Sequence, residues 1–258
     1  MTLREMWTAG QSTLGAWLTI PSTVSAETAG RAGFDYVCVD NQHGVSDYQV
    51  TVTMMQAVLL GGGTPIVRVP WNEPGIIGKM LDAGAEGVIV PMVNSAAEAQ
   101  AVVTACRYPP LGMRSFGPVL VMPRIPDHTN VANSRTAVIP MIETVEALNH
   151  LDEILAVPGV DAIYVGPADL SLSLGLPPGN NDGQAKFDDA LAMIVAACGR
   201  HGVVPGMHSS GALAERRLEQ GFRMLTVSGD LLAMRGAMGA ELAQARGAAK
   251  PAASKSVY

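Results

Sequence analysis

The feature that most constrains the fold is a series of eight short apolar segments, separated by longer helical ones. Most of these segments are continuously apolar instead of alternating, which is typical of strands covered on both faces in a parallel sheet. The predicted strands are Gly15–Ile20, Tyr36–Asp40, Pro65–Val69, Gly87–Met92, Ala137–Glu143, Ala162–Gly166, Val204–His208 and Met224–Ser228.

Helical segments follow these strands, and most of them end at a glycine. Glycine adopts the left-handed conformation that ends a helix, and Gly33, Gly84 and Gly202 repeat the same helix-to-strand turn. The predicted helices are Ala26–Ala32, Tyr48–Leu60, Glu73–Ala83, Ala96–Arg107, Val145–Ala156, Asp188–Arg200, Ala212–Gln220 and Leu231–Ala248.

Eight strand–helix units in a chain of 258 residues predict an α/β protein with one (β/α)8 TIM-barrel domain over residues 1–249. An open doubly wound sheet is the main alternative, because a sequence does not show whether the sheet closes. Two segments lie outside the repeat. The 28 residues of Tyr108–Arg135 contain five prolines and are expected to form a loop that contacts another subunit. The polar residues 250–258 are expected to form a disordered tail.

Charge and hydropathy argue against several kinds of partner. The net charge is −6 and no basic block is present, so we expect no nucleic acid as partner. No run of 18 apolar residues occurs and the charged N-terminus lacks the apolar core of a signal peptide, so we expect neither a membrane span nor secretion. Cys38, Cys106 and Cys198 lie far apart in apolar segments, which predicts reduced, buried thiols in a cytoplasmic protein.

Two carboxylates stand at the ends of neighbouring predicted strands. Barrel enzymes place their active sites at the carboxyl ends of the strands, where Glu143 closes one apolar strand and Asp169 follows the next. Two such carboxylates without a nearby cysteine or paired histidine suit a hard divalent cation, Mg²⁺ or Mn²⁺. In the alternative interpretation, Glu143 pairs with an arginine and Asp169 caps a turn. Because both lie at adjacent strand ends, we favour the metal site.

Other polar side chains occupy the same end of the barrel. Arg68 lies within an apolar strand and needs an anion, for which Glu143, Asp40 or a substrate oxyanion are candidates. His43 follows Asp40 by three residues, so Asp40 could accept a hydrogen bond from one imidazole nitrogen and leave the other as a base. His208 ends a later strand and is the reserve candidate. A plain ion pair and an idle loop histidine are the alternative interpretations of Arg68 and His43.

Two absences narrow the chemistry. None of the four lysines stands at a predicted strand end, which disfavours a Schiff-base aldolase and a pyridoxal-phosphate enzyme. No Gly-x-Gly-x-x-Gly follows the first strand, which weakens a nicotinamide-dependent activity.

Several ordered motifs resemble the HpcH/HpaI aldolase family. The resemblance runs from about Gly15 to Leu176, more loosely to the last helix, and Pro140–Thr144 together with Gly159–Leu170 is its most specific part. The other motifs are Phe34–Gly44, Val67–Pro70, Leu81–Pro91 and Tyr108–Gly112.

The resemblance implies a class II pyruvate aldolase that needs a divalent cation, Mg²⁺, Mn²⁺ or Co²⁺. Such an enzyme reversibly cleaves 4-hydroxy-2-oxo acids to pyruvate and an aldehyde through a metal-stabilised pyruvate enolate. The family is typically a homo-hexamer of swapped barrels, with the C-terminal helix as the exchanged element. The resemblance therefore implies the same assembly here.

The resemblance also implies roles for individual residues. Glu143 and Asp169 would bind the metal, and Arg68 would stabilise the keto oxygen as it becomes an enolate. His43, oriented by Asp40, would transfer a proton. The remaining roles concern substrate binding: the backbone around Gly166, Pro167, Ala168 and Asp169 would bind the pyruvate carboxylate, and Asp82 or the long loop would reach a neighbouring subunit's site.

The chain departs from the family pattern on the side of the aldehyde. Many relatives have Glu in place of Gln42 and Gln in place of Met141, and the Met113–Gly117 segment also differs. These departures leave the aldehyde acceptor open, and three other functions are also open. Decarboxylation of oxaloacetate would form the same enolate, a CoA-ester lyase would need a nucleotide site that the sequence does not show, and a sensor of carboxylic acids would bind without turnover.

Overall fold

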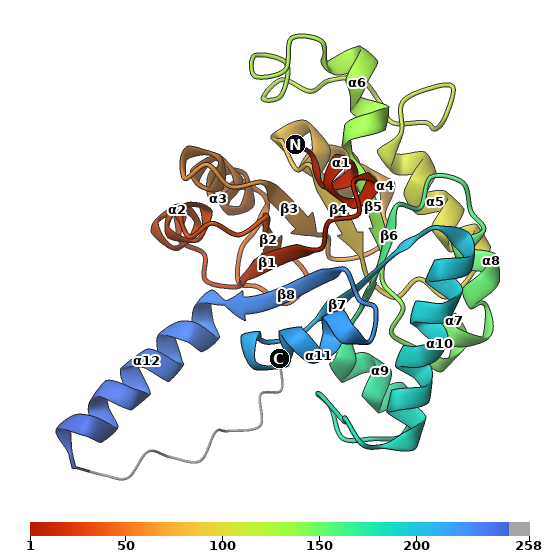
Figure 1. Ribbon diagram of the computed structural model, residues 1–258. Helices are drawn as coiled ribbons and strands as arrows, with labels where there is room; N and C mark the ends of the chain where they lie inside the picture. Colours follow the sequence, from red (N-terminus) through yellow and green to blue (C-terminus); the bar gives the residue numbers. More distant parts are fainter. Residues whose placement is uncertain (248–258) are drawn as a thin grey trace.

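Eight parallel strands form one sheet that curves into a nearly closed barrel (Figure 1). The structure is a computed structural model that describes residues 1–247, and the predicted tail at 250–258 lies outside the described residues. The strands are β1 (Thr13–Leu18), β2 (Tyr36–Asp40), β3 (Pro65–Arg68), β4 (Gly87–Val90), β5 (Ala137–Pro140), β6 (Ala162–Val165), β7 (Val204–His208) and β8 (Met224–Gly229).

The pairing of the strands settles the choice between barrel and open sheet. The order is β5-β4-β3-β2-β1-β8-β7-β6, so the chain runs around the sheet in sequence and returns to its start. Just beyond β5, Met141 forms a parallel bridge with Tyr164 of β6. The N–H of Ile142 donates to the carbonyl of Tyr164 over 3.0 Å. The two outer strands of the sheet therefore meet, and the predicted (β/α)8 barrel is confirmed.

Helices surround the sheet, and most lie where the sequence predicted them. They are α1 (Leu3–Thr8), α2 (Thr23–Arg31), α3 (Tyr48–Leu60), α4 (Pro74–Ala83), α5 (Ala96–Cys106), α6 (His128–Arg135), α7 (Val145–Asn149), α8 (Leu151–Leu155), α9 (Pro167–Ser173), α10 (Ala185–His201), the 3-10 turn η1 (Gly211–Leu213), α11 (Ala214–Glu219) and α12 (Asp230–Ala245).

Three helices were not predicted, and one prediction was wrong in its length. The expected helix Val145–Ala156 is two short helices, because His150 has φ −106° and ψ 15°, outside the helical range. The segment predicted as a loop contains α6 at its end, and α1 and α9 were missed because short helices carry little periodicity.

The apolar side chains form two layers. The outer layer lies between the strands and the helices, and the inner one fills the barrel. Leu3 and Trp7 of α1 belong to the inner layer, so α1 closes one end of the barrel. The outer layer contains 45 buried residues and the inner one 14, and their burial is the main favourable contribution to the folding free energy. The three cysteines are free and buried, as predicted.

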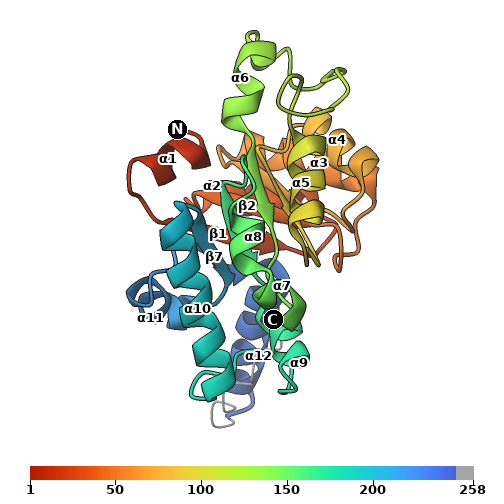
Figure 2. The same ribbon diagram turned by 90° about the vertical axis from the view of Figure 1, so that its right-hand side faces the viewer.

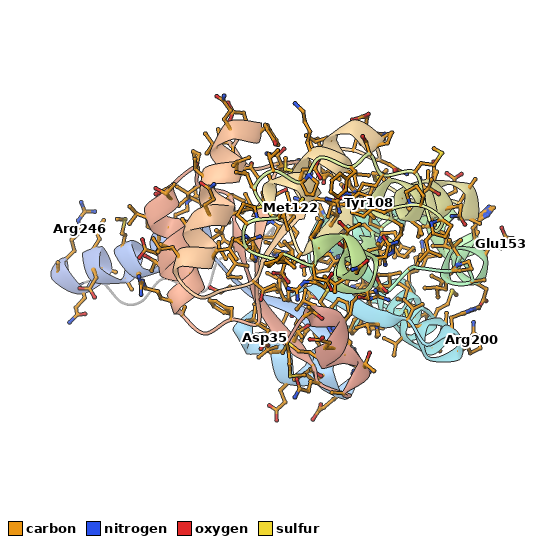
Figure 3. The ribbon with its side chains drawn as sticks, turned by 90° about the horizontal axis from the view of Figure 1, so that it is seen from above. Asp35, Tyr108, Met122, Glu153, Arg200 and Arg246 are labelled. Atoms are coloured by element: carbon orange, nitrogen blue, oxygen red, sulfur yellow. The ribbon has the colours of Figure 1, made fainter. Side chains whose placement is uncertain are left out.

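Two elements project from the barrel at opposite ends. The segment that includes α6 extends from one end, while α9 and α12 lie toward the other (Figures 1 and 2). Seen from the α6 end, Tyr108 and Met122 lie over the middle of the molecule, and Arg246 marks the outer end of α12 (Figure 3). No residue of α12 is buried, and the helix carries five exposed large apolar side chains: Leu231, Leu232, Met234, Met238 and Leu242.

Within residues 1–247, none of the helices combines the length and the apolar composition needed to cross a lipid bilayer.

Candidate functional site

A small pocket opens at the carboxyl ends of the strands and collects most of the predicted site residues. Arg68 comes from β3, while Gly166, Pro167, Ala168 and Asp169 form the junction between β6 and α9. The full lining consists of Trp17, Arg68, Met141, Tyr164, Gly166, Pro167, Ala168, Asp169 and His208. Residues from β1, β3, β6 and β7 thus converge because the closed barrel brings their ends to one face.

Arg68 forms a buried ion pair with Asp40 on the neighbouring strand. The two residues are paired in the register of β2 and β3. The guanidinium Nε donates to Asp40 Oδ1 over 2.8 Å, and Nη2 donates to Oδ2 over 2.6 Å. Burial raises the pKa of Asp40, but hydrogen bonds from Arg68 outweigh this effect and the pKa is lowered overall. Asp40 therefore stays ionised, and it fixes Arg68 in a bidentate geometry.

The third nitrogen of the guanidinium, Nη1, has no hydrogen-bond partner in the described part of the chain. Arg68 is only 6 % exposed, and its Cζ atom lies 4.9 Å from the centroid of the Trp17 ring. Trp17 also donates from Nε1 to Asp40 Oδ2 over 3.2 Å. The side chain is thus held on two sides, and its free nitrogen can serve a ligand in the pocket.

Glu143 lies just beyond β5 and carries an oxygen that nothing compensates. Its side chain is almost fully buried, with a residue exposure of 2 %. The N–H of Met92 donates to Oε1 over 2.9 Å, but Oε2 has no partner among residues 1–247. Burial raises the pKa of Glu143 to about 7, and the negative charge of Asp169 also raises it. A buried carboxylate with an unpartnered oxygen needs a proton or a cation.

The backbone of Met92 is arranged for this contact. Met92 has φ +56°, the left-handed conformation that only glycine adopts without strain. The strained turn directs its N–H toward Glu143 Oε1. Backbone strain of this kind concentrates at functional sites.

Gly166 provides the space in which the free oxygen of Glu143 lies. A Cβ atom on Gly166 would lie 2.3 Å from Glu143 Oε2, far inside van der Waals contact. Gly166 is also the residue before α9, and no side chain caps the N-terminus of that helix. Asp169 stands in the first turn of α9, where its negative charge complements the helix dipole. The unpartnered oxygen of Glu143 therefore faces the backbone that leads to Asp169.

The donor set fits a hard divalent cation that keeps positions for water or substrate. No group of three or more His, Cys, Asp or Glu side chains capable of holding a metal occurs within the described residues. Two carboxylates are, however, the number that Mg²⁺ commonly takes from a protein when substrate oxygens complete its octahedron. Burial raises the pKa of Glu143 to about 7, and a cation bound to the carboxylate would offset that effect.

Asp40 and Glu143 do not line this pocket themselves but lie against its lining residues Arg68 and Gly166, and two further predicted site residues lie away from it. His43 is exposed in the loop after β2, and its imidazole forms no hydrogen bond with a described residue. The expected contact between that imidazole and Asp40 is not formed. Instead, Asp40 Oδ1 accepts from the backbone N–H of His43 over 3.3 Å, and both carboxylate oxygens also accept from Arg68.

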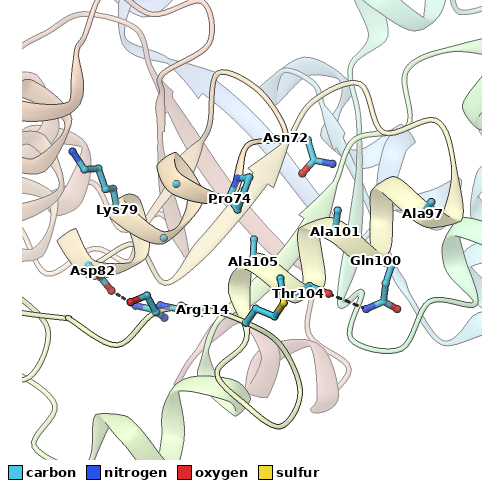
Figure 4. Close-up of a pocket in the computed structure, with 14 residues that line it drawn as sticks. Asn72, Pro74, Lys79, Asp82, Ala97, Gln100, Ala101, Thr104, Ala105 and Arg114 are labelled. Atoms are coloured by element: carbon cyan, nitrogen blue, oxygen red, sulfur yellow. Dashed lines mark hydrogen bonds and ion pairs between the residues drawn. The ribbon is translucent and has the colours of Figure 1, made fainter.

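Asp82 lies on the outer side of the barrel, in α4. It accepts a hydrogen bond from Arg114 over 2.7 Å and lines a wide groove between α4, α5 and the segment after α5 (Figure 4). Figure 4 also shows Lys79 beside this groove and Gln100 bonded to Thr104 on α5. This groove holds none of the residues around Glu143. Asp82 therefore does not contribute to the pocket of its own barrel.

Sequence analysis missed Trp17 and Tyr164, which line the pocket, and Met92, whose N–H donates to Glu143. Trp17 and Tyr164 lie in the middle of apolar strands, and their rings are stacked with centroids 5.6 Å apart. Nothing in an apolar strand distinguishes side chains that point into the barrel from those that point outward. The reserve candidate His208 does lie in the pocket, with its ring edge toward Trp17 at 5.1 Å between centroids.

Comparison with known proteins shows which family this chain resembles. The model of the HpcH/HpaI aldolase/citrate lyase family matches residues 13–237. A hydroxypyruvate/pyruvate aldolase of Rhizorhabdus wittichii is 40% identical over 249 residues, 95% of this chain and 98% of the relative. A 4-hydroxy-2-oxo-heptane-1,7-dioate aldolase of Salmonella paratyphi A is 39% identical over 245 residues, 92% of this chain and 91% of the relative.

A solved structure agrees with these sequences. A family protein from Burkholderia cenocepacia superposes with a TM-score of 0.87 at 30% identity, and the alignment covers 95% of this chain and 98% of that one. The family model's match to residues 13–237 includes every residue that lines the pocket. By fold, by sequence and by the extent of both matches, the chain belongs to the HpcH/HpaI aldolase/citrate lyase family.

Proposed function

We propose that this chain is a divalent-metal-dependent aldolase that cleaves 4-hydroxy-2-oxo acids to pyruvate and an aldehyde, and catalyses the reverse addition. One observation carries the proposal: the buried, unpartnered oxygen of Glu143 faces the Gly166–Asp169 junction, whose residues line a pocket together with Arg68. In this proposal an anionic group that binds the metal and a cationic group both act on one small ligand. A 2-oxo acid offers the matching pattern of carboxylate and keto oxygen.

Glu143 and Asp169 would hold the cation, Mg²⁺, Mn²⁺ or Co²⁺, on the side of the pocket formed by the ends of β5 and β6. When bound, such a cation supplies Lewis-acid polarisation of the keto oxygen.

The start of α9 would bind the substrate carboxylate. The N–H groups of Ala168 and Asp169 belong to the first turn, where no intrahelical acceptor exists, and no side chain caps them. Pro167 has no N–H and fixes the backbone angle with which the helix begins. Both free N–H groups therefore stay available to an anion at the pocket.

Arg68 would stabilise the charge that develops during the reaction. In the cleavage direction the C3–C4 bond breaks, its electron pair passes to C3, and the keto oxygen takes on enolate character. The free Nη1 of Arg68 can donate to that oxygen while Asp40 holds the other two nitrogens in place. A preorganised donor of this kind needs no rearrangement as the charge forms.

A proton must leave the C4 hydroxyl as the aldehyde forms, and a proton must later reach C3 to give pyruvate. His43 is our candidate for this transfer, because it is exposed in the loop directly above Asp40. Asp40 would act on it only indirectly, by accepting from the backbone N–H groups of Gln42 and His43 and thereby shaping the loop. Asp40 is thus a positioning residue for Arg68.

The names of the relatives suggest the substrates. We propose pyruvate as one donor and hydroxypyruvate as another, with an aldehyde as acceptor. The chain would work as a homo-hexamer in the cytoplasm. The exposed apolar side chains of α12 support an assembly, and the buried free cysteines agree with a reducing compartment.

The test is pyruvate release from a 4-hydroxy-2-oxo acid, coupled to lactate dehydrogenase. Protein stripped with EDTA should be inactive, and Mg²⁺, Mn²⁺ or Co²⁺ should restore the rate. Glu143→Gln should stay inactive with every metal, whereas Glu146→Gln, an exposed glutamate on α7, should behave as wild type. Full activity of the stripped protein would contradict the metal dependence. Release of carbon dioxide from oxaloacetate without any aldolase activity would make the chain a decarboxylase instead.

A further inference from the structure

A chain of hydrogen bonds crosses the apolar interior of the barrel and ends in the pocket. The hydroxyl of Tyr36 is 3.1 Å from Thr226 Oγ1, and the hydroxyl of Tyr164 is 2.6 Å from the same oxygen. Tyr164 then lies 3.3 Å from Nδ1 of His208. Tyr36, Tyr164 and Thr226 are all buried. Neither the proposed cation site nor the proposed proton transfer uses this network.

The network determines which nitrogen of His208 carries the hydrogen. Tyr164 has one O–H, which it donates to Thr226 Oγ1. The contact between Tyr164 and His208 must then be a donation from Nδ1–H to the tyrosine oxygen. Burial lowers the pKa of His208 to about 4, the positive charge of Arg68 lowers it further, and Asp40 opposes this weakly. The ring is therefore neutral near pH 7, with its hydrogen on Nδ1 and a lone pair on Nε2.

His208 lines the pocket, and Nε2 has no hydrogen-bond partner among residues 1–247. The imidazole ring packs edge-on against the ring of Trp17. The Arg68 guanidinium packs over the same indole. A ligand held by Arg68 therefore lies within reach of His208. What Nε2 lacks is a hydrogen-bond donor, which a simple pyruvate methyl group does not provide.

We propose that His208 is a specificity-determining residue whose Nε2 accepts a hydrogen bond from a hydroxyl on C3 of the 2-oxo acid donor. The inference rests on the proposed function, because it assumes that Arg68 binds the keto oxygen on C2. The carbon next to that keto group then carries its substituent toward His208. The pocket would accordingly select 3-hydroxylated 2-oxo acids, of which hydroxypyruvate is the smallest, over pyruvate.

The first experiment measures kcat/KM for hydroxypyruvate and for pyruvate with one acceptor that has no hydroxyl group, such as propionaldehyde. In His208→Leu the ratio of the two values should fall at least about tenfold, because the site loses its acceptor. His208→Gln keeps an acceptor oxygen and should retain a larger share of the ratio. Tyr164→Phe should give an intermediate ratio, because Nδ1 loses the partner that fixes its hydrogen. His201→Leu, on the outer end of α10, is the matched control.

The second experiment does not depend on turnover. Calorimetry with the Mn²⁺-loaded protein and no aldehyde should show tighter binding of hydroxypyruvate than of pyruvate in wild type, and near-equal binding in His208→Leu. Nitrogen-15 NMR should show the Nδ1–H form of His208 at pH 7. If both compounds bind and the ratio is unchanged in His208→Leu, or if Nε2 carries the hydrogen, the specificity role is wrong while the aldolase stands. If wild type binds neither compound, both proposals are wrong.

Discussion

Arg68 uses two of its three guanidinium nitrogens on Asp40 and leaves the third to the pocket. Arg68→Lys should lower kcat/KM on the order of 10²-fold, because an ammonium group cannot bind Asp40 through two nitrogens and also reach the keto oxygen. Arg31→Lys is the matched control, since Arg31 forms an exposed pair with Glu27 on α2. Steady-state kinetics and a thermal melt of each variant separate the catalytic effect from loss of stability.

The same pair can be tested for its independence from His43. Since Asp40 binds Arg68 and not the imidazole, Asp40→Asn and Arg68→Lys should be strongly non-additive in kcat/KM. Asp40→Asn and His43→Asn should be closer to additive. The reverse pattern would show that Asp40 acts through His43 and would contradict the geometry described above.

The raised pKa of Glu143 predicts a pH-dependent affinity for metal. Below about 7 the metal-free carboxyl holds a proton that must leave when the cation binds, so affinity should rise with pH up to about 7 and then level off. The slope should be at most about tenfold per pH unit. Calorimetry with Mn²⁺ in buffers of different ionisation enthalpy measures both the affinity and the released proton. A flat profile from pH 5.5 to 8 would contradict the prediction.

The raised pKa of Glu143 also determines how the free energy of unfolding changes with pH. Between the usual pKa of a glutamate, 4.5, and about 7, the folded metal-free protein binds a proton that the unfolded chain has lost. The contribution of Glu143 to the free energy of unfolding therefore decreases as the pH rises through this range. Glu143→Gln should remove that dependence, while Glu146→Gln should keep it.

The position of a residue could be predicted where its chemical type is unusual for its segment. Its interaction partner could not be predicted where the strand register determines the contact. The positions of Glu143 and Asp169 just beyond neighbouring strands could be predicted, because a carboxylate that ends an apolar strand is unusual. The partner of Asp40 was not predicted, because His43, three residues away in sequence, was the preferred candidate. The register of β2 and β3 instead places Arg68 directly beside Asp40. Sequence separation says nothing about such a pairing.

At the scale of elements, the junction of β6 and α9 depends on the absence of a side chain at Gly166. A methyl group there would lie 2.3 Å from Glu143 Oε2 and 3.0 Å from Met141 Cε. Gly166→Ala should displace Glu143 and weaken metal binding by roughly tenfold or more. Its backbone φ of −91° suits alanine, so the loss is steric and not a matter of backbone conformation.

The control for that substitution is Gly199→Ala, because a Cβ atom at Gly199 in α10 would meet nothing within 4 Å. It should leave metal affinity unchanged and raise the free energy of unfolding by about 0.5–1 kcal/mol, the usual gain for alanine over glycine in a helix. Titration with Mn²⁺ and chemical denaturation of both variants provide the comparison. Equal metal affinity in the two variants would contradict the proposed place of Glu143.

Long elements could be predicted from their sequence, and short ones could not. The strand Tyr36–Asp40 and the helix Tyr48–Leu60 have the predicted bounds, since continuous apolar runs and glycine stops are strong signals. The seven residues of α9 looked like a turn after a strand. That helix forms because Pro167 starts it and Leu170 is buried against the barrel, a tertiary contact that the local pattern does not contain.

At the scale of the whole molecule, eight repeated units implied the barrel, but closure depends on a contact between distant segments. Met141 and Tyr164 meet across the last gap of the sheet. Their pairing follows from the twist and tilt of all eight strands together, and no local pattern reports it. Composition and periodicity likewise do not predict that α12 points away from its own barrel.

The projecting helix gives the last prediction. α12 has five exposed large apolar residues and none buried, and an apolar groove lies beside its base, lined in part by Leu18, Val24 and Phe34. An exposed apolar surface of this kind is typical of a face that another chain covers. If α12 packs on a neighbouring subunit, Met238→Asp should reduce the mass in light scattering from about six times the chain mass of 26.9 kDa.

Met193→Asp is the matched control, because Met193 is an exposed methionine on α10, outside the projecting helix. Met193→Asp should leave the mass unchanged, because Met193 lies outside the face that is expected to pack on a neighbouring subunit. Metal affinity of the Met238→Asp variant should stay near that of wild type, because Glu143 and Asp169 come from one barrel. A wild-type protein with the mass of a single chain at micromolar concentration would contradict the hexamer and leave the exposed face of α12 to be explained by another partner.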